Sequence, residues 1–105
     1  MAAKHEKSIL VNAPLMLVVE RLRYLPASGM KMTLQGECPY QNGAMFQIKH
    51  GVGMTSWGEN ITMVLLPVGA DQTSVSIRSE CVLPTQIIDW GQNKKNVENL
   101  IRYLS

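Results

Sequence analysis

The side chains best suited to chemistry in this chain are a histidine, a glutamate, a serine and a cysteine: His50, Glu59, Ser79 and Cys81. An imidazole beside a carboxylate can accept and pass on a proton, and a thiolate is a strong nucleophile. If the fold brings these groups together, they form either a Cys81–His50–Glu59 nucleophilic site or the polar rim of an apolar binding groove.

The alternation of apolar residues along the predicted strands places all four side chains on the inner face of a sheet. Side chains two positions apart in a strand share a face, and each of the four lies an even number of positions from core-facing residues. In an antiparallel meander the end of one strand lies beside the start of the next. We therefore expect the four to meet at one end of the inner face. The core-facing residues from which this inner face is predicted are Phe46, Ile48, Ile61, Met63, Leu65, Val75 and Ile77.

Both tryptophans stand in the same short pattern, W-G-x-N. Trp57 begins W-G-E-N and Trp90 begins W-G-Q-N. Glycine after each ring allows another group to approach closely, and Asn60 and Asn93 can bond nearby backbone groups. We predict that Trp57 and Trp90 join the same ligand-binding site, with their indoles within about 10 Å of each other.

The elements that must position these residues follow from apolar periodicity. Residues 1–6 are expected to be loosely ordered, and the first strand covers 7–12. Asn12 can cap the helix that follows, with Pro14 in its first turn and Pro26 ending it. The helix stripe is Leu15, Val18, Val19, Leu22 and Leu25, and further strands are predicted over 30–38, around 46–48, over 57–66 and over 73–82.

A second helix closes the chain. Its apolar stripe comprises Val97, Leu100, Ile101 and Leu104, and its polar residues, including Asn96 and Asn99, are expected to face water. The start of this helix is open. Thr85 could cap a long helix, but Asp89 is favoured because a cap there keeps Gly91 out of the helix middle.

The resulting order, β-α-β-β-β-β-α, predicts an α+β domain with a curved five-stranded antiparallel sheet and two helices packed on one face. This layout resembles the TATA-binding-protein-like fold and a shortened helix-grip domain of the START type. The START resemblance implies strand order 1-5-4-3-2 and a C-terminal helix that encloses an apolar cavity against the sheet. Phe46 is the only phenylalanine, so the paired wedges of the TATA-binding protein are missing.

Composition indicates one globular domain, residues 1–105, with 46% hydrophobic and 17% charged residues. The net charge of +2 is too small for binding driven by a polyanion backbone. Asn12 and Pro14 interrupt the longest apolar run, so we expect no membrane span and a cytoplasmic protein. Cys38 and Cys81 could form one bridge, although buried thiols are favoured.

The leading prediction is a non-enzymatic binding or interaction module that holds an apolar small molecule or a protein segment between the sheet and the C-terminal helix. No metal or other cofactor is expected, because no pair of cysteines or histidines has metal-site spacing. The alternatives are a nucleic-acid-binding outer sheet face with Lys31, Lys49 and Arg78, and the cysteine enzyme described above. The edge strands could support a homodimer, with Lys31 guarding the second strand.

Overall fold

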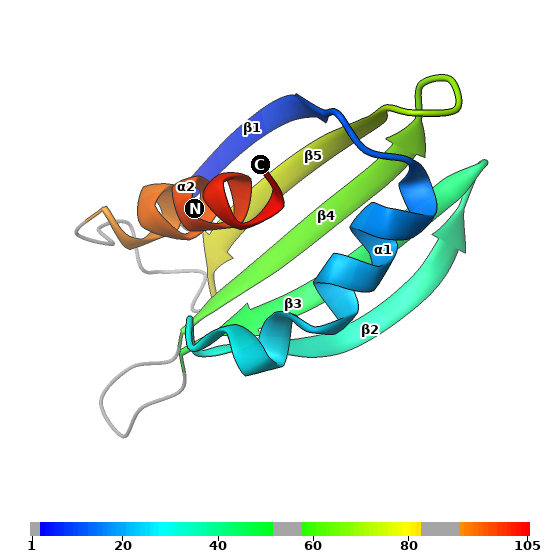
Figure 1. Ribbon diagram of the computed structural model, residues 1–105. Helices are drawn as coiled ribbons and strands as arrows, with labels where there is room; N and C mark the ends of the chain where they lie inside the picture. The colour runs from blue at the N-terminus through cyan, green and yellow to red at the C-terminus, as the bar shows by residue number, and fades with distance from the viewer. Residues whose placement is uncertain (1–2, 52–57, 83–90) are drawn as a thin grey trace.

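The computed structural model describes residues 3–51, 58–82 and 91–105, and within them the elements have the predicted order (Figure 1). They are β1 (Lys4–Val11), α1 (Leu15–Arg23), a short 3₁₀ helix η1 (Leu25–Ser28), β2 (Met32–Tyr40), β3 (Gly43–His50), β4 (Glu59–Pro67), β5 (Thr73–Cys81) and α2 (Gln92–Leu104).

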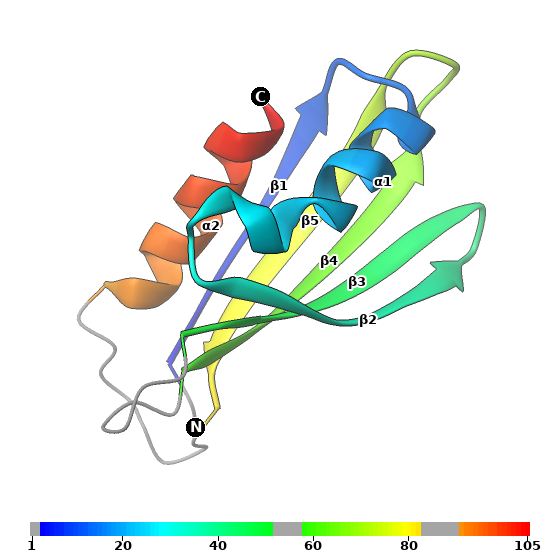
Figure 2. The same ribbon diagram turned by 60° about the horizontal axis from the view of Figure 1, so that its bottom comes forward.

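The strands form one curved antiparallel sheet in the order β1-β5-β4-β3-β2, which confirms the predicted topology. The two outermost strands, β1 and β2, are the edges among the described residues. Because β1 pairs with β5, the first and the last strand in the sequence lie side by side. Both helices lie on the same face of the sheet (Figure 2), so in the described residues the opposite face carries no helix.

The core lies between the sheet and the helices, as the alternation predicts. On the central strands, Phe46, Met63 and Ile77 are 0–1% exposed. The helices contribute side chains at i, i+3 and i+4 spacing, and burying each large apolar side chain stabilises the fold by about 1.5–3 kcal/mol. The helical core residues are Val18, Val19, Leu22, Leu25, Val97, Leu100 and Leu104.

The first strand and the first helix differ at their ends from the prediction. β1 begins at Lys4, so residues 4–6 belong to the sheet because they pair with β5. Asn12 does not cap α1. Pro14 occupies the N-cap position, and the Asn12 side chain accepts a hydrogen bond from Gln72 at 2.9 Å.

The second strand corrects the prediction for Cys38. A bulge between Leu34 and Gly36 inserts one residue, and this reverses which side chains face the core. Cys38 is therefore exposed, whereas Cys81 is buried, and both are thiols rather than a bridged pair.

The last helix corrects two further predictions. α2 begins at Gln92 behind Gly91, so neither Thr85 nor Asp89, which lie outside the described residues, is its N-cap. Asn96 is fully buried instead of facing water.

Candidate functional site

The sheet register brings His50, Glu59, Ser79 and Cys81 to one end of the inner face, as predicted. His50 on β3 lies opposite Glu59 on β4, and Glu59 in turn lies opposite Cys81 on β5. Ser79 lies two residues before Cys81, opposite Ile61. Trp57 and Trp90, the other two predicted site residues, lie outside the described residues, and so does the predicted distance between their rings.

Two asparagines from α2 complete this group. We call His50, Glu59, Ser79, Cys81, Asn93 and Asn96 the inner polar cluster. One carboxylate oxygen of Glu59, Oε1, lies 2.7 Å from His50 Nδ1 and accepts a hydrogen bond from Asn96 Nδ2 at 2.8 Å. Asn96 Nδ2 also approaches Ser79 Oγ at 3.2 Å. The carboxylate thus links β3, β4 and the final helix.

The other half of the cluster is organised by Asn93. Its side-chain oxygen accepts a hydrogen bond from Ser79 Oγ at 2.8 Å. Its amide nitrogen donates to the carbonyl of Ala3 at 2.9 Å and lies 3.6 Å from Cys81 Sγ. Because Ser79, Asn93 and Asn96 are completely buried, these bonds replace the water that the polar groups lose on folding.

Sequence reasoning missed the role of Asn96 and identified only part of the role of Asn93, which does bond a backbone carbonyl as predicted. A signal was present in the helix spacing. Asn93, Val97, Leu100 and Leu104 recur at intervals of four, three and four residues, which is the period of a buried helix face. Polar residues at this period indicate a hydrogen-bonded core position.

The glycines of the two W-G-x-N copies both have a positive φ angle. Gly58 and Gly91 have φ of +76° and +80°, a region that side chains other than glycine rarely adopt. At Gly58 a Cβ would also overlap the carbonyl oxygens of His50 and Gly51. The copies differ beyond the glycine, since Asn60 is exposed and Asn93 is buried.

The geometry of the cluster does not favour the nucleophilic alternative. His50 and Cys81 lie on strands that flank β4, with Glu59 between them. Two strand spacings separate their backbones by about 10 Å. Among the described residues, no group of three histidine, cysteine or acidic side chains could hold a metal ion.

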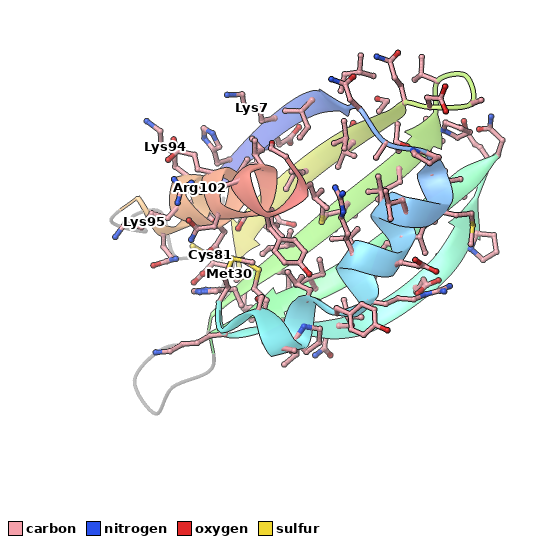
Figure 3. The ribbon with its side chains drawn as sticks, in the orientation of Figure 1. Lys7, Met30, Cys81, Lys94, Lys95 and Arg102 are labelled. Carbon is pink, nitrogen blue, oxygen red and sulfur yellow. The ribbon has the colours of Figure 1, made fainter. Side chains whose placement is uncertain are left out.

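An open, shallow cleft lies between η1 and α2. It has a volume of about 400 Å³ and is lined by Ser28, Met30, Asn99, Arg102 and Tyr103, which we call the helix cleft. Met30 precedes the start of β2, where Met32 pairs with His50, and Asn99 lies three residues after Asn96 on α2. Figure 3 shows Met30 near η1 and Arg102 on α2.

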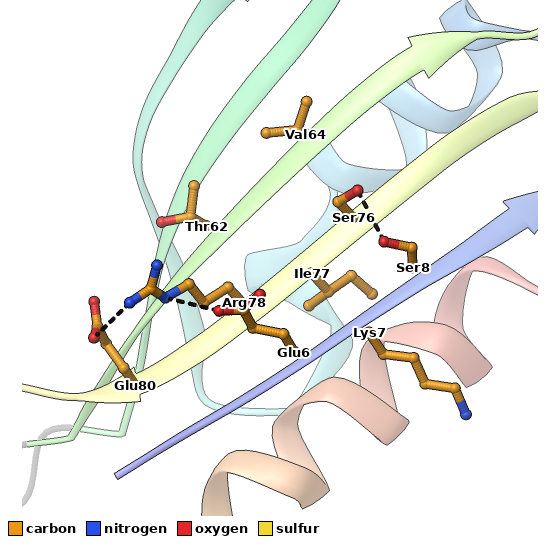
Figure 4. A pocket seen from close by; sticks show the side chains of 9 residues that line it. All are labelled: Glu6, Lys7, Ser8, Thr62, Val64, Ser76, Ile77, Arg78 and Glu80. Atoms are coloured by element: carbon orange, nitrogen blue, oxygen red, sulfur yellow. Dashed lines mark hydrogen bonds and ion pairs between the residues drawn. The ribbon is translucent and has the colours of Figure 1, made fainter. Parts of the chain in front are cut away.

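On the outer face of the sheet, acidic side chains lie beside a basic one and offset its positive charge. Arg78, one of the cations considered for nucleic-acid binding, lies 3.5 Å from Glu6 and 3.4 Å from Glu80 (Figure 4). The positive charge available to a phosphate backbone is therefore reduced, and this reduction disfavours the nucleic-acid alternative.

No family model and no curated protein sequence matches this chain. A solved structure does: a START superfamily protein from Mycobacterium smegmatis, with 12% sequence identity and a TM-score of 0.56 over 96% of this chain and 93% of that one. At this identity the likeness concerns the fold, and it supports the START-type layout predicted from the order of elements. No helix within the described ranges has the length and apolar character needed to cross a membrane.

Proposed function

We propose that this protein is a non-enzymatic module that binds a small molecule with an apolar body and an anionic group in the helix cleft. The observation that carries the proposal is the cleft itself, which combines apolar walls with a few polar side chains, as ligand sites generally do. It lies between η1 and α2, the C-terminal helix that is expected to enclose the groove of a START-type fold.

The walls of the helix cleft have distinct chemical roles. Met30 and the ring of Tyr103 offer apolar contact, while Arg102 and Asn99 offer hydrogen-bond donors to an anionic group. Tyr103 is held in place, because its hydroxyl donates to the carbonyl of Arg21 at 2.6 Å. Arg21 in turn donates to the carbonyl of Leu104 at 3.2 Å, so the wall joins α1 to α2.

The inner polar cluster anchors α2, which forms one wall of the cleft, to the sheet through Asn93 and Asn96. We propose that His50, with 18% of its side chain exposed against 9% for Glu59, is the cluster member that a bound molecule reaches first. Ser79 and Cys81 stabilise α2 from beneath, and Trp57 and Trp90 remain proposed contributors to the site. A cytoplasmic location and the absence of a cofactor also remain predictions.

Fluorescence titration with 1-anilinonaphthalene-8-sulfonate, an anionic apolar probe, tests this function. We expect saturable binding to the folded protein and a loss of about tenfold in affinity for Arg102→Glu, because a carboxylate would then face the anion. Lys94→Glu is the matched control, since it makes the same charge change on α2 away from the lining residues.

Equal losses in the two variants would contradict the cleft as the site and would indicate a general charge effect. Native mass spectrometry of the protein purified from its own cells identifies the natural ligand. A copurified small molecule that Arg102→Glu fails to retain supports the proposal, and a natural ligand retained equally by Arg102→Glu contradicts it.

A further inference from the structure

The outer face of the sheet has a regular chemical pattern that the strand register makes explicit. Residues that pair across all five strands form rows, and one row has no charge. We call it the uncharged row: Ser8, Ser76, Val64, Met45 and Cys38, in the strand order β1-β5-β4-β3-β2. Leu10 and Leu66 extend this uncharged region towards the hairpin end, and Leu10 is 53% exposed.

Two charged rows lie beside the uncharged row, on the side away from the turn that joins β4 to β5. In the first, Glu6 and Arg78 are the only charges. In the second, Lys4, Glu80 and Lys49 are charged. In the same strand order, the first row is Glu6, Arg78, Thr62, Gln47 and Gly36, and the second is Lys4, Glu80, Asn60, Lys49 and Thr33.

The face is also uneven in height. A hollow of about 260 Å³ lies over β1, β5 and β4, where the side chains of Ser8, Ser76 and Thr62 are short (Figure 4). On the other side of β4, the longer side chains of Met45 and Gln47 occupy the same two rows on β3. A second hollow, of about 350 Å³, lies towards the other end of the face, between Gln35, Gln47, Asn60 and Glu80. In the uncharged row, the side chains over β1 and β5 are thus short, whereas β3 carries the longer Met45.

We propose that this outer face packs against the outer face of a second copy of the chain, about a two-fold axis parallel to the central strand β4. Such an axis keeps each row opposite itself and reverses the order of the strands. Two sheets packed face to face in this aligned manner lie about 10 Å apart with interdigitating side chains.

The two-fold axis brings complementary groups together. Glu80 of one copy lies opposite Lys49 of the other, and Val64 lies opposite Val64 on the axis. Met45 and Gln47 of the second copy lie opposite Ser76 and Arg78, so they enter the hollow. In none of the three rows does a charge oppose a charge of the same sign, which would cost affinity.

The competing arrangement is less favourable. A two-fold axis in the sheet plane but perpendicular to β4 would keep the order of the strands and exchange the rows, so Glu80 on β5 would never lie opposite Lys49 on β3. Only the axis parallel to β4 keeps every row opposite itself and gives both of these charges a partner of opposite sign.

The available area fits a second copy. Five strands about 4.8 Å apart and four rows about 6.8 Å apart give roughly 650 Å² per copy, or about 1,300 Å² in total. Stable specific interfaces bury about 1,200–2,000 Å². The face carries both signs of charge, with Lys4, Lys49 and Arg78 against Glu6 and Glu80, so a second copy of the same face complements it better than a strongly charged partner would.

A charge exchange tests the proposal on the full-length chain. Sedimentation velocity of the wild type should show a dimer at micromolar concentration. Glu80→Lys and Lys49→Glu should each raise the dimer dissociation constant by about tenfold or more, because like charges then oppose each other across the interface. The double variant, Glu80→Lys with Lys49→Glu, should return most of the lost affinity.

Glu6→Lys is the matched control, because Glu6 contacts Arg78 as Glu80 does but lies opposite Gly36 of the second copy. We expect it to leave the dimer within about threefold of wild type. Circular dichroism establishes that each variant is folded. A wild type that stays monomeric to about 100 µM overturns the proposal. A folded double variant without restored affinity, or a control as weak as Glu80→Lys, overturns the proposed orientation.

Discussion

Neighbouring residues of β5 place polar groups in opposite environments. Ser79 points inward to the inner polar cluster and has no exposed surface. Arg78 and Glu80, on either side of it in sequence, point outward and keep 46% and 40% of their side chains exposed. The same strand therefore carries one polar side chain that is sealed from water and two charged side chains that remain in contact with it.

The difference shows that exposure, more than the formal charge, decides the energetic weight of these groups. A buried hydrogen-bonding group that loses its partner costs about 1–3 kcal/mol, and more when it carries a charge, because no water replaces the bond. An exposed ion pair contributes about 0–1 kcal/mol, since water and salt compensate for its loss. We therefore expect mutations in the inner polar cluster to lower the free energy of unfolding more than mutations on the outer face of the sheet.

The largest effect is expected for Asn96→Ala, which removes the buried donor that Glu59 and Ser79 share. The variant should lose about 3 kcal/mol in the free energy of unfolding, because a buried carboxylate loses an amide partner on α2. Urea unfolding at fixed protein concentration measures this loss. Asn99→Ala on the same helix should cost less than about 0.5 kcal/mol, and a similar loss in both variants would contradict a special role for Asn96.

An intermediate effect is expected for Ser79→Ala. This change leaves the buried side-chain oxygen of Asn93 without its 2.8 Å donor, and it should cost about 2 kcal/mol. Ser76→Ala makes the same change on the outer face, where in the monomer its partner Ser8 can bond to water, and should cost less than about 0.5 kcal/mol when unfolding is measured on the monomer. The same unfolding measurement compares the two serines, and equal values would refute the distinction between the faces.

The smallest effect is expected for the exposed pair that joins α1 to β2. Arg23 donates to both carboxylate oxygens of Glu37, at 3.0 and 2.7 Å, and this hydrogen bonding holds the pKa of Glu37 below its ordinary value. A lowered pKa in the folded state stabilises the protein above the ordinary pKa of the carboxyl group. That contribution disappears as the pH falls through the folded value.

Glu37→Gln should therefore have a slightly lower melting temperature than the wild type at neutral pH, and the gap should narrow at about pH 3, which is below the ordinary pKa of the carboxyl group. Thermal unfolding at both pH values measures it. A gap that persists or widens in acid would mean that the ion pair is not its source.

Period-two alternation predicted the inner face of β3, β4 and β5, and with it the meeting of His50, Glu59, Ser79 and Cys81. The same rule failed for Cys38 because it assumes an uninterrupted strand. The bulge after Leu34 adds one residue to β2, and nothing in the alternation of that segment separates a bulged strand from a regular one. The wrong assignment of Asn96 had another cause, since asparagine was taken as polar and hence exposed.

Local periodicity and short connections between antiparallel strands were enough to predict the number and order of the strands and α-helices and the inward faces of β3, β4 and β5. They did not predict which polar residues of α2 bond to which strand, because that depends on how α2 crosses β1 and β5. Only the tertiary structure paired Asn93 with Ser79 and Asn96 with Glu59. The physical reason is that a buried polar group is stable only beside a partner, and partners distant in sequence are brought together by packing alone.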